Sequence, residues 1–416
     1  MTIMLIRIMA IILTMIILRP LDVKKIVDSK KWVLVYGRRK TGKTFLVQHF
    51  VRFDEYFFVK NSGSILTKTS DSITYETFLE IFRRAIGENK IVVVDEFHRL
   101  GKDFFDYLHF MKKNGKVILI SSTLFLSKKL ISEKSALLGL FAEAPIGIIN
   151  LRDVLNALKK INCSLKEQLE LAVLLREPIA IDYFDPMVNA RKTLAEIIVS
   201  SSKTIPALIG EIFVEEEREI SGVYEGILRA IASGKVGSGE ITQYLFSKKL
   251  IKKEDSSMIQ QYLNNLTSFG IIRKIGVFNK RRFIYKLTSP LARIYYYADE
   301  KYNLSERVVS EKEMATIIDE LMPRIVEDTV REFLSEKNGL IENVIDSSDF
   351  EVDGVLLKFK KPEIVLEVKW KKIGEKEIRE IEEKLSKIQA KKKILFVPDK
   401  TRIKSFLTVM DASDLY

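Results

Sequence analysis

The sequence predicts an α/β fold built in several parts, and three patterns carry this prediction. Apolar, strand-like runs alternate with helical segments through residue 150, which favours a parallel sheet. One of these runs leads directly into a glycine-containing loop and then into a helix. Further along the chain, three helical segments precede two strand-like runs, and a second region of strands and helices follows them.

Length and composition are those of a multidomain globular protein. The chain has 416 residues, of which 47% are hydrophobic and 30% charged, and this length corresponds to about three domains. A single cysteine, Cys163, excludes an intramolecular disulfide and a thiolate zinc site. With only three histidines, a His-rich metal centre is also disfavoured. The cysteine usage fits a reducing cytosol, so we expect a cytoplasmic protein.

The positive charge is concentrated in two parts of the sequence. The formal net charge is +12, while residues 1–150 alone carry +10 and residues 221–290 carry +8. Two basic blocks predict polyanionic partners such as a nucleotide or a nucleic acid. The alternative is a basic surface that only contacts water.

The N-terminal segment, Met1–Leu18, is apolar except for Arg7 and two threonines. Its uninterrupted run is shorter than the ~20 residues of a membrane-spanning helix, and no small-residue cleavage site follows it. Three alternatives remain open: a buried helix, a spurious extension from an upstream start codon, or a membrane anchor. In the last case Lys24, Lys25, Lys30 and Lys31 would keep the rest of the chain in the cytoplasm.

A phosphate-binding loop is the strongest motif in the chain. The apolar run 32–36 predicts a buried strand, and a helical pattern begins at Phe45. Between them the sequence has the form G-x-x-x-x-G-K-T, with Gly37, Arg38, Arg39, Lys40, Thr41, Gly42, Lys43 and Thr44. Backbone N–H groups of such a loop surround phosphates. We expect Lys43 to reach the β- and γ-phosphates of ATP and Thr44 to hold Mg²⁺.

Acidic residues at the end of a neighbouring strand would complete this site. The run 91–94 is β-branched and apolar, and Asp95 and Glu96 follow it. Asp95 is expected to bind Mg²⁺, and Glu96 to orient or deprotonate the attacking water. A third run, 117–120, ends in the hydroxyl residues 121–123. One of these could sense the γ-phosphate, although a plain strand-to-turn transition fits equally well.

Residues 151–220 have helical periodicity and are interpreted as a helical lid behind the nucleotide site. Residues 221–290 predict a winged helix. Its helices are expected at 224–232, 239–250 and 258–269, with Met258, Tyr262, Leu266 and Phe269 on one face of the third, and a hairpin follows. The third helix would enter a DNA major groove, with Lys280, Arg281 and Arg282 on phosphates. The alternative is a winged helix used only for packing.

A further set of acids lies near the C-terminus. The strand-like runs 350–356 and 364–370 carry Asp353 and the pair Glu367-x-Lys369. Side chains alternate along a strand, so Glu367 and Lys369 share a face, and a hairpin would bring Asp353 beside Glu367. Two carboxylates can hold Mg²⁺ while a lysine positions water for phosphodiester attack. The alternative is a solvated ion-pair face.

Together these residues resemble the archaeal-type ATPase family of the STAND/AAA-like P-loop class. The resemblance rests on GRRKTGKT at 37–44, IVVVDEF at 91–97, VYEGILRAIASG at 223–234, YLNNLTSFGIIRK at 262–274 and the strand pair at 353–370. It implies a P-loop NTPase parallel sheet with a helical lid, then a winged-helix domain and a C-terminal α/β domain like the PD-(D/E)xK restriction nucleases. It also implies that Asp353, Glu367 and Lys369 form a nuclease core, with Glu327 as the acid of the preceding helix.

The resemblance also defines the expected domains. These are an apolar segment (1–20), an ATPase core (21–150), a helical lid (151–220), a winged helix (221–290), a linker (291–319) and a nuclease-like domain (320–416). The expected partners are ATP, DNA through residues 221–290 and a second copy of the chain. Two functions stay open: a DNA-linked ATPase with metal-dependent cleavage, or a nucleotide-dependent regulatory switch without nuclease activity.

Overall fold

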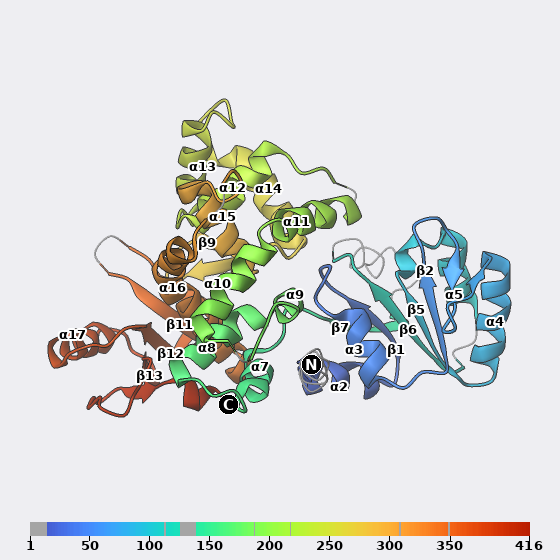
Figure 1. The fold of residues 1–416 in the computed structure, drawn as a ribbon, viewed down its shortest axis with the longest axis horizontal. Coiled ribbons are helices and arrows are strands. Elements are labelled where there is room, and N and C mark those ends of the chain that lie inside the picture. Colours follow the sequence, from blue (N-terminus) through green and yellow to red (C-terminus); the bar gives the residue numbers. More distant parts are fainter. Residues whose placement is uncertain are drawn as a thin grey trace, which may run out of the picture.

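The computed structural model describes residues 15–111, 114–124, 139–186, 188–216, 218–307, 309–347 and 350–416. The first fourteen residues of the predicted apolar segment therefore lie outside the described part of the chain. Figure 1 shows an N-terminal α/β unit, in blue and teal, beside a larger unit that contains the remaining helices and a second sheet.

The N-terminal unit is built on a seven-stranded sheet with the order β4-β3-β2-β5-β6-β1-β7. The strands are β1 Trp32–Tyr36, β2 Glu55–Val59, β3 Ile65–Leu66, β4 Ser72–Ile73, β5 Ile91–Asp95, β6 Lys116–Ser121 and β7 Phe141–Pro145. From β2 to β7 all neighbours in this order are parallel, and β3 and β4 add an antiparallel edge. The parallel α/β sheet predicted through residue 150 is therefore present.

Helices cover both faces of this sheet, because the central strands are apolar on both sides. The helices are α2 Pro20–Val27, α3 Lys43–Phe50, α4 Tyr75–Gly87 and α5 Lys102–Phe110. Side chains of β1 alternate between the two layers: Val33 and Val35 pack with α2 and α3, while Leu34 packs with α4 and α5.

The strand order corrects one detail of the prediction. Asp95 ends β5, but β5 is not the neighbour of the loop-bearing strand β1, because β6 lies between them. The hydroxyl residues that follow β6 are consequently brought to the centre of the site, between the phosphate-binding loop and the acids.

Residues 151–220 are helical, as their periodicity predicts. The helices are α7 Leu151–Leu158, α8 Leu165–Leu175, α9 Pro178–Ile181, α10 Ala190–Ser201 and α11 Thr204–Glu215. Within the described residues no single helix has the length and apolarity needed to cross a membrane. Taken together, the bent pair α10 and α11 does have the length and composition of a membrane-spanning segment. Many of its apolar side chains are buried in the protein.

Three helical segments and a hairpin follow, in the predicted order. They are α12 Gly222–Ala232, α13 Ser238–Ser247, a 3-10 turn Ser256–Ile259 continuing into α14 Gln260–Ser268, and the strands β8 Ile272–Val277 and β9 Phe283–Leu287. The face of the third helix predicted from Met258, Tyr262, Leu266 and Phe269 differs at its start from the face that is buried. Met258 is 43% exposed, and Ile259, one position further, is buried together with Leu263 and Leu266.

The predicted linker, 291–319, is wrong as well. It consists largely of α15 Pro290–Tyr302 and the first turns of α16 Glu311–Asn338. Most of α15 is buried, including Leu291, Ile294 and Tyr296, and packs in the same core as the lid helices and α16. This segment therefore connects its neighbours by packing, and is not a spacer.

The second sheet joins the hairpin to the C-terminal region. It has the order β14-β13-β12-β11-β10-β8-β9, with β10 Ile341–Ile345, β11 Val352–Lys358, β12 Lys361–Val368, β13 Lys392–Phe396 and β14 Thr408–Met410. Helix α17 Glu375–Ser386 packs against it through Ile381 and Leu385. Because β8 pairs in parallel with β10, the predicted boundaries at 290 and 320 separate strands of one continuous sheet.

Candidate functional site

The backbone of the loop between β1 and α3 depends on its two glycines. A Cβ atom on Gly37 would collide with the backbone carbonyl of Ile146. Gly42 has a φ of 83° and caps the N-terminus of α3, a left-handed conformation that favours glycine. The loop is thereby held against β7 with the N-terminus of α3 at its end, an arrangement that suits phosphate groups.

Lys43 lies inside this loop. Its Nζ donates a hydrogen bond to the Arg38 carbonyl at 2.7 Å, and the side chain is buried. Burial lowers the pKa of Lys43 to about 8, although the nearby Glu96 and Asp95 carboxylates oppose this shift. The Lys43 ammonium group is thus held at the loop. Phosphates bound there would stabilise its charged form, which burial disfavours.

Thr44 and Asp95 form the inner part of the site. The Thr44 hydroxyl donates to Asp95 Oδ2 at 2.7 Å, and Tyr56 donates to the same oxygen at 2.7 Å. Asp95 is buried, which raises its pKa. A hydroxyl and a carboxylate side by side are the hard oxygen ligands that Mg²⁺ prefers, so the donor set fits this ion.

Glu96 sits next to the acid of β5 in a conformation that few non-glycine residues adopt, with a φ of 56°. Its carboxylate accepts a hydrogen bond from the Ser122 hydroxyl at 2.9 Å and lies 3.4 Å from His98 Nδ1. The Ser121 hydroxyl lies 3.0 Å from the same His98 nitrogen. Ser122, directly after β6, therefore holds the Glu96 carboxylate, and Ser121 contacts the neighbouring His98. The sequence alone had left two interpretations of these hydroxyls open, a γ-phosphate sensor or a plain strand-to-turn transition.

The side chains of the two loop arginines interact with the helical segment 151–220. Arg39 pairs with Glu211 at 2.7 Å and with Glu215, both on α11. Arg38 is buried near Glu177, whose carboxylate accepts the Ser289 hydroxyl at 2.7 Å and the Leu291 N–H at 3.0 Å. Their side chains therefore connect the loop to α11 and to the start of α15, and phosphate contacts at these positions would come from the backbone.

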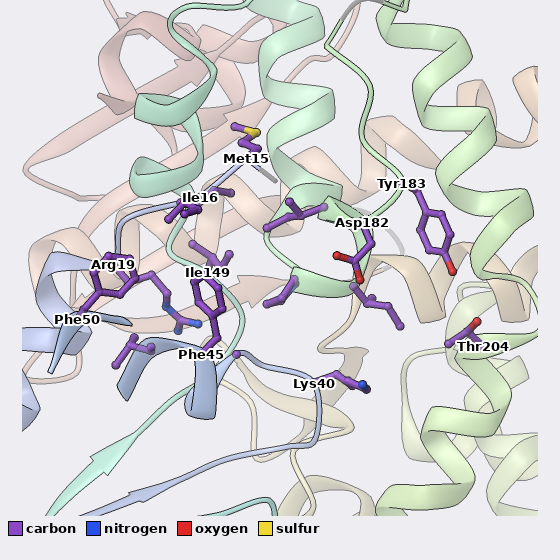
Figure 2. Close-up of a pocket in the computed structure, with 16 residues that line it drawn as sticks. Met15, Ile16, Arg19, Lys40, Phe45, Phe50, Ile149, Asp182, Tyr183 and Thr204 are labelled. Carbon is purple, nitrogen blue, oxygen red and sulfur yellow. The ribbon is translucent and has the colours of Figure 1, made fainter. Parts of the chain in front are cut away.

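An apolar cavity of about 460 Å³ adjoins the loop and was not predicted from the sequence. Figure 2 shows Arg19, Phe45 and Phe50 on one side of it and Asp182, Tyr183 and Thr204, from the lid, on the other. Arg19 is buried and donates to the carbonyls of Thr41 at 2.7 Å and Gly147 at 3.0 Å. The one sequence signal that Arg19 would contact the loop is its position as a charged residue between an apolar segment and Pro20.

The C-terminal acids are also brought together. Asp353 Oδ2 accepts the Val368 N–H at 2.7 Å, and Lys369 Nζ donates to Glu367 at 2.7 Å. Burial, then the charges of Glu327 and Glu367, raises the pKa of Asp353 well above its usual value. Across the described residues, however, no three Asp, Glu, His or Cys side chains are grouped closely enough to hold a metal ion.

Two residues of this cluster were missed at the sequence level. Lys384, on α17, donates to both oxygens of Glu367 at 2.7 and 2.8 Å. Arg331 is fully buried on α16 and donates to the Asp353 carbonyl at 2.7 Å. Neither has a local motif, because each reaches the cluster from a helix distant in sequence.

The basic hairpin tip is partly engaged within the protein. Arg282 contacts the carboxylate of Asp346 at 2.9 Å, and Lys280 donates to the Asp346 carbonyl at 3.3 Å. Arg281 is exposed. Since β10 runs from Ile341 to Ile345 and then to Asp346, this tip lies at the same end of the sheet as Asp353, whose neighbour Val352 pairs with Ile345.

Comparison with known proteins agrees with the N-terminal site. The family model described as an AAA domain matches residues 29–140. A protein of Methanocaldococcus jannaschii, described as "Uncharacterized protein MJECL04", is 22% identical over an alignment of 407 residues that covers 88% of each chain.

Solved structures with partial likeness include two proteins of Aeropyrum pernix. One is the ORC2 protein in ADPNP-ADP complexes, with 15% identity, 72% of this chain and 89% of that chain covered, and a TM-score of 0.37. The other is the ORC1 protein in complex with DNA, with 13% identity, 70% and 94% covered, and a TM-score of 0.31. TM-scores of this size do not show that the whole chains share a fold.

The parallel sheet, its loop and the family match define the N-terminal unit as an AAA-type P-loop domain. This is the class expected from the motifs at 37–44 and 91–97.

Proposed function

We propose that this protein binds and hydrolyses ATP with Mg²⁺. The observation that carries the proposal is the direct contact between the Thr44 hydroxyl and Asp95, beside the buried ammonium of Lys43. These three groups come from a loop and from a strand distant in sequence, yet they meet as phosphoryl transfer requires. Bound Mg²⁺ would neutralise charge on the phosphates.

The cavity beside the loop is the proposed site of the nucleoside. It adjoins Lys40 and Gly42, its walls are mainly apolar, and the partly exposed ring of Phe45, which stacks on His49, has remaining surface for a flat base. Arg19 supports this site by holding the loop through the Thr41 carbonyl. One wall comes from the N-terminal unit and the other from the lid, so a bound nucleotide would join the two.

Glu96 is the proposed base that orients or deprotonates the attacking water. Ser122 holds one carboxylate oxygen at 2.9 Å, and the charge of Glu96 acts on Lys43. A general base must lie within hydrogen-bond reach of the proton that it removes. The strained backbone at Glu96 is of the kind that persists where a side chain must be aimed.

DNA is the proposed macromolecular partner, bound by residues 221–290. Gln260, Gln261 and Asn264 are exposed on α14, and Lys252 and Lys253 are exposed just before it. The hairpin tip lies at the sheet end that also holds Asp353. A duplex on α14 and the tip would therefore run toward the carboxylate cluster.

Alanine replacement of Lys280, Arg281 and Arg282 tests this partner. The slope of log affinity against log salt for a 20-base-pair duplex is expected to fall by roughly 0.9 for each phosphate that the variant no longer neutralises. Because Lys280 and Arg282 also contact Asp346, the change should be nearer that of one phosphate than that of three. Binding measured by fluorescence anisotropy at several salt concentrations provides the slope. If the salt dependence of duplex binding is unchanged, the three side chains of the tip contact only the protein and not DNA.

Metal-dependent phosphodiester cleavage is the second candidate function, favoured by the convergence of Asp353, Glu367 and Lys369. Mg²⁺ or Mn²⁺ would relieve the repulsion between buried carboxylates, so either ion is expected to raise the melting temperature of the full chain. D353N should abolish that shift, whereas E375Q, at an exposed carboxylate, should retain it. Identical melting in EDTA, Mg²⁺ and Mn²⁺ would leave the alternative of a nucleotide-dependent switch without cleavage.

A further inference from the structure

The hairpin between β11 and β12 ends in an unusual tip. Lys358 pairs with Lys361, so the turn consists of only two residues, Phe359 and Lys360. Both have positive φ values, 48° and 66°. A two-residue turn with positive φ at both positions favours the sequence Asn-Gly. Bulkier residues strain the backbone in this left-handed conformation. A bulky aromatic residue there is the opposite of what stability alone would favour.

The Phe359 ring projects into solvent. It is 88% exposed, and the three lysines of the tip are exposed around it. Strained residues persist where function demands them, and an uncovered aromatic ring needs a partner to contribute any binding energy. The tip thus presents one flat apolar surface enclosed by positive charge.

Neighbouring strands extend this basic surface. Lys392 pairs with Ile364 at the start of β13, and Lys391 precedes it. Both lysines are exposed, although Lys391 pairs with Glu363 at 2.9 Å. On the other side, Ile341 of β10 pairs with Leu357 and is 62% exposed. We define the tip patch as Lys358, Phe359, Lys360, Lys361, Lys391 and Lys392.

The tip patch lies apart from the sites described above. The Lys280–Arg282 hairpin and Asp353 occupy the opposite end of the same strands. The seven residues of β11 separate the two ends by roughly 20 Å at about 3.3 Å per residue. The patch therefore lies apart from the basic hairpin tip and from the carboxylate cluster, and its test can be made without nucleotide.

We propose that the tip patch binds single-stranded nucleic acid, with Phe359 stacked on an unpaired base and the lysines on adjacent phosphates. Positive charge along a backbone path together with an exposed aromatic ring is the combination that single strands recognise. In a duplex, only the terminal base pairs have a free face on which such a ring could stack. An anionic membrane would also attract the lysines, but one ring and one isoleucine provide little apolar area for insertion.

The test measures binding of the full chain to fluorescein-labelled dT20, to a 20-base-pair duplex, and to vesicles containing phosphatidylserine. F359A is expected to weaken dT20 binding roughly tenfold, as loss of one stacked base does, with a smaller effect on the duplex. F110A is the matched control, because Phe110 is equally exposed, at 88%, on α5 of the N-terminal unit. Alanines at Lys358, Lys360 and Lys361 should lower the dT20 salt slope by about 2.

A second variant separates binding from folding. Replacement of Phe359-Lys360 by Asn-Gly places favoured residues in the turn, and should raise the melting temperature by about 2–4 °C while dT20 binding falls. Equal affinity of F359A and the parent chain for dT20, an equal loss in F110A, or binding to vesicles without binding to dT20 would each overturn the proposal.

Discussion

Replacement of Lys43 by alanine is expected to weaken ATP binding by about 10- to 100-fold, since a charged hydrogen-bonding group facing the phosphates is lost. E96Q should retain binding, because Thr44 and Asp95 remain in contact, but should slow hydrolysis by roughly 10²–10⁴-fold, the usual contribution of a positioned base. Calorimetric titration measures the first effect and release of phosphate the second.

The matched control for E96Q is E88Q. Glu88 is also a carboxylate of the N-terminal unit, but it forms an exposed pair with Lys90, and its replacement should leave turnover unchanged. Hydrolysis by E96Q at the parent rate would contradict the role assigned to Glu96, without affecting the binding site itself.

The lowered pKa of Lys43 adds a pH signature to the same titration. With a pKa of about 8, Lys43 of the nucleotide-free protein is half neutral at pH 8. Phosphates should raise this pKa, so ATP binding at pH 8 should be accompanied by the uptake of about half a proton. At pH 6 the lysine is already charged, so the uptake should vanish. K43R, which does not titrate in this range, is expected to show none at either pH.

The second large effect concerns the buried charges that join the hairpin to the C-terminal region. Arg331 is fully buried and pairs with Asp328 and with Glu342, the latter at 2.7 Å. R331M would remove the fully buried cation of this network, while Arg293 and Lys286 stay paired with Asp328 and Arg273 with Glu342. The loss of unfolding free energy is therefore expected to be at or below the about 3–5 kcal/mol that an unpaired buried charge costs. R379M, at an exposed pair, should cost less than about 1 kcal/mol.

Tryptophan fluorescence during urea unfolding can locate this loss. Trp370 is buried in the larger unit, where its Nε1 donates to Glu170 of α8 at 2.9 Å, while Trp32 is in β1 of the N-terminal unit. R331M should shift the transition reported by Trp370 in a W32F background, and leave that of Trp32 in a W370F background nearly unchanged. Equal shifts of both would contradict a local role for Arg331.

The loop and acids of the proposed nucleotide site were predictable because the information that defines them is local. The loop 37–44 lies between a strand and a helix, and its glycines are required by close approach and by positive φ. The acids at 95 and 96 follow a strand that hydrophobicity alone identifies. What the sequence did not contain was the order of strands, which places β6 between β1 and β5 and brings Ser122 to Glu96.

The sequence by itself determined the residues of the glycine-containing loop, the acids Asp95 and Glu96 at the end of β5, the helical character of 151–220 and the position of Asp353 and Glu367 on adjacent strands. The tertiary structure alone decided that β8 joins β10 in one sheet, that α15 is a largely buried helix, and that Lys384 and Arg331 reach the C-terminal acids. Local motifs follow from backbone geometry and spacing. These other features arise from burial of apolar faces and charges contributed by segments far apart in the chain, and no short pattern encodes them.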